Sequence, residues 1–187
     1  MTSPTLLRAT ALTLLLGACV SDLLTLDVEQ SGSTVVEGGG LVGAALGVLA
    51  ITGFDDLSVA VDQELANQGV APGDIASVYL TALTLSTPDG DDLAFLESLT
   101  FLVESPGLPS VRIAYADAFP EGVTSLPLKL EGVDLTAYVV AESMTITTVA
   151  EGTLPEEDTT VDADMTLAIE ATAQGACNQA ERAAAAE

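Results

Sequence analysis

Apolar and polar residues alternate with a period of two along several stretches of this chain. In the longest stretch, 161–172, Val, Ala, Met, Leu and Ile occupy the odd positions, and mostly Asp, Thr and Glu occupy the even ones. Successive side chains of a strand point to opposite faces, whereas a helix repeats its apolar positions every three or four residues. This segment is therefore predicted to be a strand with one buried face.

Shorter stretches follow the same rule. Their in-phase residues are Leu24, Leu26 and Val28; Leu99, Phe101 and Val103; Val111, Ile113 and Tyr115; and Leu126, Leu128 and Leu130. Two other stretches slip in phase. In 75–86 the apolar positions shift parity between Ala82 and Leu83, and in 144–149 the slip falls at Thr147-Thr148. A β-bulge inserts one residue and re-aims the side chains after it, so we predict a bulge in each stretch.

Turn-forming residues separate these strands. They are Pro88-Asp89-Gly90-Asp91, Pro106-Gly107, Pro120-Glu121-Gly122 and Leu154-Pro155-Glu156-Glu157. The last turn is expected to join 144–153 to 158–172 as a long antiparallel hairpin. Many short strands at regular spacing predict an all-β fold, an antiparallel β-sandwich of the Ig-like or Greek-key kind.

One or two short helices are expected beside the strands. Segment 59–68 precedes Gly69, a residue that ends helices, and segment 133–142 can begin at Asp134 as its N-cap. Segment 38–53 is apolar and glycine-rich, but it is too short to cross a bilayer. It is expected to form a loop and a short strand over one end of the core; an apolar patch facing lipid or a partner is the alternative.

The amino-terminal segment has a different pattern. Arg8 precedes an apolar stretch, 9–16, which is followed by the small residues Gly17 and Ala18 and then by Cys19. This is the layout of a secretory signal. The sequence Leu16-Gly17-Ala18-Cys19 resembles the lipobox of bacterial lipoproteins, in which a Leu stands three residues before an invariant Cys.

The resemblance implies that the chain is cut between Ala18 and Cys19 and that the Cys19 thiol carries a diacylglyceryl group. Buried acyl chains then anchor the protein to a membrane, at roughly 0.8 kcal/mol per CH₂. Val20 and Ser21 follow the Cys where Asp would mark retention in the inner membrane, so the outer membrane is favoured. The domains expected are a signal peptide (1–18), a lipid-anchored domain (19–177) and an Ala-rich tail (178–187).

Lipidation of Cys19 leaves Cys177 without an intrachain partner, and no disulfide is expected. Cys177 could pair between molecules, or it is a small residue without a role.

The charge of the chain limits the kinds of partner that it can bind. The chain has 28 acidic and 4 basic residues and a formal net charge of −24. Nucleic acids and anionic headgroups require cationic neutralisation, so binding to either through charge is disfavoured. Because 49% of the residues are hydrophobic, the chain can nevertheless bury a core instead of remaining a disordered acidic tail.

The chain lacks the residues that most catalytic mechanisms require. The chain has no His, which removes Ser-His-Asp and Cys-His arrangements and imidazole ligands, and it contains no P-loop or dinucleotide fingerprint. We expect no enzyme activity and no cofactor; a hydrolase with a carboxylate pair is a third reading, poorly supported because aromatic residues make up only 4%.

Calcium is the metal that carboxylates suit best. The candidates are Asp89, Asp91 and Asp92, which either bind Ca²⁺ in the millimolar range or simply form a turn.

The sequence thus predicts a non-catalytic, lipid-anchored envelope protein that acts as a structural or protein-interaction module with an unidentified envelope protein. The alternative is a binding protein for an apolar or lipid-like ligand held between the sheets. A large cavity lined from both sheets would favour the alternative, and a filled core would favour the first.

Overall fold

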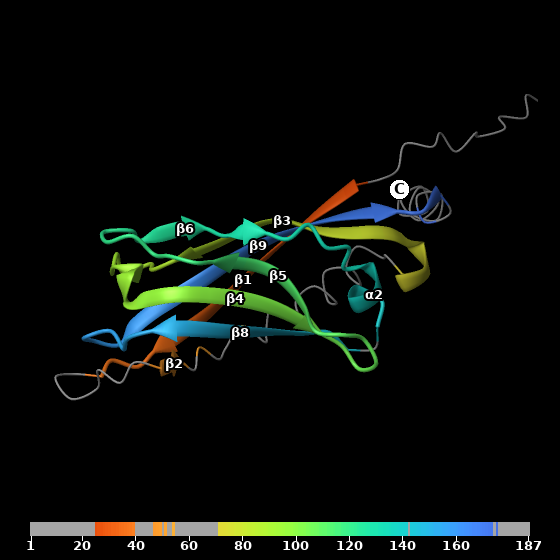
Figure 1. Ribbon diagram of the computed structural model, residues 1–187. Helices are drawn as coiled ribbons and strands as arrows, with labels where there is room; N and C mark the ends of the chain where they lie inside the picture. Colours follow the sequence, from red (N-terminus) through yellow and green to blue (C-terminus); the bar gives the residue numbers. More distant parts are fainter. Residues whose placement is uncertain are drawn as a thin grey trace, which may run out of the picture.

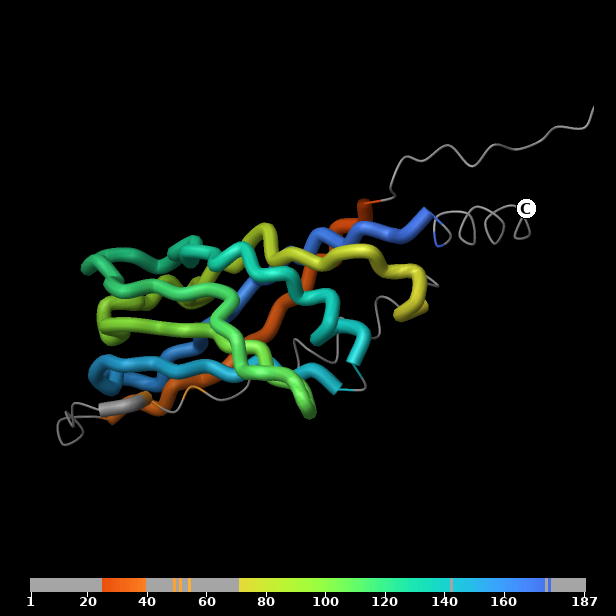
Figure 2. The backbone as a smooth tube through the Cα atoms, turned by 45° about the vertical axis from the view of Figure 1, so that its right-hand side comes forward, coloured from red at the N-terminus to blue at the C-terminus, as the bar shows by residue number. Residues whose placement is uncertain are grey.

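The computed structural model describes residues 25–39, 47–49, 51, 54, 71–141, 143–173 and 175. These residues form an antiparallel β-sandwich, whose two layers are visible in Figures 1 and 2. Sheet A has the strand order β1-β9-β3-β6, and sheet B has the order β2-β8-β4-β5-β7. The all-β sandwich predicted from the alternation is confirmed.

The strands of sheet A are β1 (Thr25–Val36), β9 (Thr159–Ala171), β3 (Ile75–Ser86) and β6 (Ser125–Pro127). Those of sheet B are β2 (Gly47–Leu49), β8 (Thr145–Gly152), β4 (Leu96–Glu104), β5 (Val111–Ala116) and β7 (Lys129–Leu130). The described helical segments are η2 (Pro72–Asp74), η3 (Leu93–Phe95) and α2 (Thr136–Val139).

The core lies between the sheets and is built by the alternation itself. In β9 every odd residue from Val161 to Ala171 is buried, and the even residues face outward. Across the core, β4 contributes Leu99, Phe101 and Val103, each at most 1% exposed. The ring of Phe101 lies 5.5 Å from that of Phe54 at a tilt of 45°, an arrangement that aromatic pairs favour.

The predicted phase slip in β3 is a bulge. The pairing of β3 with β9 shifts register between Leu80 and Ala82, so Thr81 is the extra residue. Leu80 before it and Leu83 after it are both buried, although they differ in parity. The bulge thereby keeps both apolar runs pointing into the core.

The slip predicted at Thr147-Thr148 is wrong. Strand β8 pairs with β4 without interruption from Thr145 to Glu151, and the shift falls in β4 instead, at Glu97. Strand β8 simply directs Val149 outward, where it is 45% exposed, and Thr148 inward, where its hydroxyl donates to the carbonyl of Ile51. The exposed Val149 made the apolar positions of this stretch look like a change of phase.

The predicted hairpin between 144–153 and 158–172 is also wrong. Strands β8 and β9 lie in different sheets, and the intervening residues cross from one layer to the other. Strand β9 is paired on both sides, by β1 and β3, so it has no free edge for β8. The amide of Gly39 donates to the Pro155 carbonyl and that of Gly38 to the Asp158 carboxylate, which ties this crossing to the end of β1.

Segment 126–131 is likewise two strands, not one. Strand β6 pairs with β3 in sheet A, and β7 pairs with β5 in sheet B. Between them Leu128 is buried, and its amide donates to the Leu83 carbonyl at 2.8 Å. The chain thus changes sheets while its leucines remain against one core.

The helix expected over 133–142 is a single turn, α2. Its N-cap is Leu135, one residue after the predicted Asp134. The Asp134 carboxylate nevertheless accepts the amide of Thr136 at 2.9 Å, which gives it the capping role that its residue type predicts. The expected helix over 59–68, the signal segment, Cys19, Cys177 and the tail lie outside the described residues.

Segment 38–53 contains the expected short strand. Strand β2 pairs with β8 at the edge of sheet B, and Leu49 and Ile51 are 7% and 4% exposed. The apolar character of these described residues is therefore explained by burial in the core.

Gly152 should tolerate no larger residue. A Cβ built there would lie 2.2 Å from the backbone oxygen of Phe95, next to the Glu97 bulge. We expect Gly152→Ala to lower the free energy of unfolding by about 2 kcal/mol through overpacking. Gly73→Ala is the control, since a Cβ there meets nothing within 4 Å; it should change stability by less than about 0.5 kcal/mol. Urea unfolding of both variants measures the difference, and equal effects would contradict this account of the contact.

Candidate functional site

The two outer faces of the sandwich differ in chemistry. The outer face of sheet A is acidic and rich in hydroxyl groups; its carboxylates are Asp27, Glu29, Asp162, Asp164 and Glu170. Ser31 and Ser33 of β1 donate to Asp164 and Asp162 of β9 at 2.6 Å each. Such a face is well solvated, and its like charges hinder pairing with another sheet.

The outer face of sheet B has a different composition. It carries Thr100, Leu102, Arg112, Tyr115, Lys129, Thr147 and Val149, which we call the Tyr115 face. The strand register brings these residues together: Thr100 lies between Val149 and Tyr115, and Leu102 lies between Thr147 and Arg112. Lys129 is opposite Tyr115 on the next strand. The face is therefore continuous across β8, β4, β5 and β7.

A bulge places Tyr115 on this face. The sequence pattern had put Tyr115 in phase with Val111 and Ile113, and this is wrong. The pairing of β5 with β4 shifts at Ile113, so Ile113 and Ala114 both point inward and Tyr115 points outward. The Tyr115 ring is half-buried, so part of it is accessible at the surface.

Both basic residues of the described segments gather on the Tyr115 ring. The guanidinium carbon of Arg112 lies 4.2 Å from the ring centroid, and the ammonium of Lys129 lies 5.3 Å from it. These are cation–π distances. An acidic residue also pairs with each cation. The Arg112 Nε donates to Glu131 at 2.6 Å, and the Lys129 Nζ donates to Asp117 at 3.0 Å, a bond that raises the pKa of Lys129.

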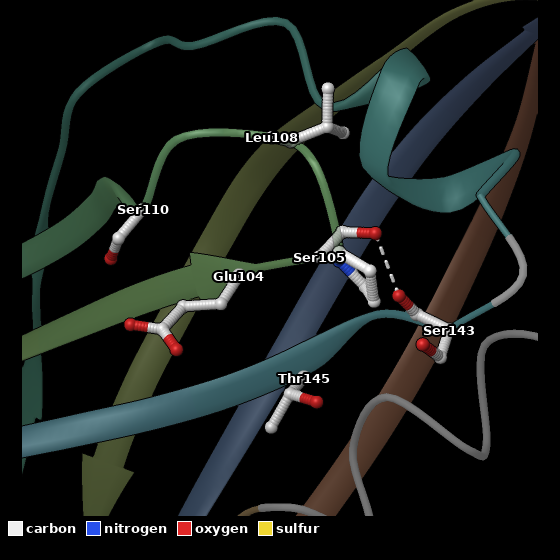
Figure 3. A pocket seen from close by; sticks show the side chains of 7 residues that line it. Glu104, Ser105, Leu108, Ser110, Ser143 and Thr145 are labelled. Carbon is white, nitrogen blue, oxygen red and sulfur yellow. Dashed lines mark hydrogen bonds between the residues drawn. The ribbon is translucent and has the colours of Figure 1, made fainter.

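A pocket opens at one end of the Tyr115 face. Its volume is about 470 Å³, and it is lined by Glu104, Ser105, Pro106, Leu108, Ser110, Ser143 and Thr145. These residues come from the turn between β4 and β5 and from the start of β8 (Figure 3). Glu104 and Thr145 are cross-strand partners on the outer face of sheet B. Glu104 and Thr145 thus join the pocket to that face, while the other lining residues belong to the loops at this end of sheet B.

The calcium candidates lie on one turn, and two of them make hydrogen bonds there. Asp92 accepts the amide of Gly122 at 2.7 Å and that of Ala94 at 2.9 Å, one with each carboxylate oxygen. The Thr87 hydroxyl donates to the Asp91 carbonyl, and Asp89 is exposed on the same turn. Within the described ranges, no three acidic, thiol or imidazole side chains converge on a possible metal position. These hydrogen bonds are typical of a turn, and calcium binding by these residues stays a prediction.

The groups on the Tyr115 face can make apolar, cation–π and hydrogen-bond contacts. The Tyr115 face offers an aromatic ring, two aliphatic side chains and hydroxyl groups, and its cations are held by ion pairs. The sequence reasoning missed this face. The available signal was that Arg112 and Lys129, two of four basic residues in the chain, stand in predicted strands; their meeting on Tyr115 needed the bulge and the register.

No protein-family model matches the chain, and no curated protein matches it. Among solved structures, one described as the decameric BFDV capsid protein overlaps with it at a TM-score of 0.34 and 11% sequence identity, over 80% of this chain and 99% of that chain. Overlap at this level does not bear on the function of the chain. None of the helices in the described part of the chain has the length and apolarity to span a membrane.

Asp92 should stabilise the fold only while it is ionised. The amides of Gly122 and Ala94 hold its pKa below the ordinary value of 3.8. Because the native-state pKa is lowered, the stabilisation is present above that ordinary value and is lost as the pH falls through the native pKa. We expect Asp92→Asn to lower the melting temperature at pH 7, with a smaller difference from the parent at about pH 2.5.

The matched control is Asp89→Asn on the same turn, which should leave the melting temperature nearly unchanged at both pH values. Thermal unfolding followed by circular dichroism measures both variants. A pH-independent difference for Asp92→Asn would contradict the role of the charged form.

Proposed function

We propose that this protein is a non-catalytic, lipid-anchored component of a bacterial envelope and that it binds another protein through the Tyr115 face. The observation that carries the proposal is the contrast between its two outer faces. On a chain of net charge −24, the Tyr115 face combines a half-buried aromatic ring with Arg112, Leu102 and Val149. The opposite face carries carboxylates, two of which accept hydrogen bonds from serine hydroxyls of β1.

The composition of the face supports protein binding. Tyr and Arg are enriched among the residues that contribute most to the binding energy of interfaces. Tyr buries a large area with few rotatable bonds, and Arg buries a large area and carries a planar hydrogen-bonding group. Here Arg112 and Lys129 are already held against Tyr115. Little side-chain freedom then remains to be lost when a partner covers the ring.

The packing between the sheets supports this reading over a ligand held in the core. The inward side chains of β3, β4 and β9 close on one another, with Val78, Leu85, Leu99 and Phe101 all 0% exposed. The described pocket opens outside the sandwich, at the turn after β4. Neither observation favours a lipid-like ligand between the sheets.

The lipobox resemblance supports the anchor. Strand β1 begins at Thr25, so a lipid on Cys19 could stand no more than about 20 Å from the start of the strand. Ala171 at the end of β9 and Ile75 at the start of β3 pair at the same end of sheet A. On this proposal that end faces the membrane, and the strands run away from it.

Replacing the acylated thiol tests the anchor. Cys19→Ser removes the sulfur to which the lipid is attached, so we expect metabolic labelling with a fatty acid to be lost and the protein to leave the membrane fraction. Mass spectrometry of the parent chain should find an acylated Cys19 at its amino terminus. A parent chain that retains Met1 and carries no acyl mass would contradict the anchor.

A charge on the Tyr115 face tests the binding role. Val149→Glu places a carboxylate on this face beside Thr100, which separates it from Tyr115, and we expect it to reduce crosslinking to an envelope partner at least tenfold. Val35→Glu is the control, because Val35 is also an exposed strand valine, at 58%, but lies on sheet A. Crosslinking in intact cells, quantified by mass spectrometry, measures both. Equal crosslink yields from the two variants would rule out this face.

A further inference from the structure

The pocket beside the Tyr115 face is lined by one carboxylate and by several hydroxyl groups. Glu104 is the one charged residue of its lining, and it faces Thr145 across the strand pair. Figure 3 shows Glu104 between Ser110 on one side and Thr145 on the other. The hydroxyl of Ser105 is already engaged, since it donates to the Ser143 carbonyl at 2.8 Å, and Ser105 is only 8% exposed. The floor of the pocket is therefore fixed, while Glu104 is exposed.

Several ligand classes do not fit this lining. An anion would meet the Glu104 carboxylate without a basic group in the pocket to offset it. A tightly held Ca²⁺ requires several carboxylate or carbonyl ligands, and Glu104 is the only carboxylate there. Carbohydrate sites are usually lined by aromatic rings, and the lining has none. An organic cation fits better than these three classes, because Glu104 supplies a carboxylate and the lining has no basic group.

We propose that the pocket receives the guanidinium group of an arginine side chain from the partner that covers the Tyr115 face. A guanidinium presents five N–H donors in one plane, and the lining offers acceptors to match them: the carboxylate of Glu104 and the hydroxyl oxygens of Ser110 and Thr145. Leu108 and Pro106 provide apolar surface for the methylene stem. The pocket volume of about 470 Å³ lies within the range of small-ligand sites.

This inference rests on the proposed function, and the geometry of the face connects the two. Glu104 and Leu102 are alternate residues of β4, so their side chains leave the same face of the sheet about 7 Å apart. A partner segment that covers Leu102 therefore has an adjacent side chain within reach of the pocket. Charge complementarity points to a basic segment, because Glu104 and Glu151 lie at the two ends of the outer face of sheet B and the chain has a net charge of −24.

The test uses the purified full chain, labelled with ¹⁵N, and N-acetyl-arginine amide as the probe. We expect saturable amide shifts over 104–110 and 143–145, in the millimolar range that a single exposed ion pair with hydrogen bonds supports. Glu104→Gln keeps the shape of the side chain and removes its charge, so it should weaken the binding roughly fivefold. Glu151→Gln is the matched control, an outward carboxylate at the other end of β8 that does not line the pocket, and should leave the affinity unchanged.

A neutral probe separates charge from apolar contact. N-acetyl-norleucine amide has a similar stem without the guanidinium and should produce no saturable shift at these residues. Three results would overturn the inference: no saturable shift with the arginine probe, equal weakening by Glu104→Gln and Glu151→Gln, or equal binding of the norleucine probe. Failure of the broader binding role would show separately, as loss of the difference between Val149→Glu and Val35→Glu in crosslinking, with arginine binding retained.

Discussion

The burial of one layer of side chains between the two sheets is the constraint on which the rest of this structure depends. The chain has few aromatic residues, so the layer is filled mainly by Val, Leu, Ile, Ala and Met, with Phe101 and Phe54 in contact near its centre. Each strand must keep its apolar side chains in that layer. Where the alternation does not fit the pairing, one strand takes an extra residue, as at Thr81, Glu97 and Ile113.

These bulges also decide what the outside of the protein presents. At Ile113 two successive inward residues satisfy the core, and the next residue, Tyr115, is turned outward between Arg112 and Lys129. A requirement of packing thus generates the aromatic and cationic centre of an otherwise acidic molecule. The ion pairs to Glu131 and Asp117 balance the charge of both cations locally.

Two faces of opposite character suit a module that binds on one side and remains solvated on the other. On sheet A, serine hydroxyls of β1 and β3 donate to carboxylates of β9, which keeps those acids ordered while they face water. On sheet B, the half-buried residues of the Tyr115 face continue into the pocket at Glu104. Contact through sheet B would leave the acidic face outward, where it opposes further association.

The sequence by itself determined the fold class and, for most of the strands, which face is buried. The odd residues of β9, the core residues of β4 and the bulge in β3 follow from a period of two, and that period is a property of neighbouring residues. The acidic charge, the absence of His and the resemblance of residues 16–19 to a lipobox also stand in the sequence alone. These features need no knowledge of what lies across the sheet.

Only the tertiary structure decided which strands share a sheet and which side chains meet. Alternation shows that β8 and β9 each bury one face, but it does not show that they lie in opposite layers, or that Leu126 and Leu130 belong to different sheets. Likewise, Tyr115, Arg112 and Lys129 come together through a bulge and two strand pairings. The physical reason is that the two-residue period gives only the side of its own strand on which a side chain lies. Which strands pair depends on contacts between residues that are far apart in the chain.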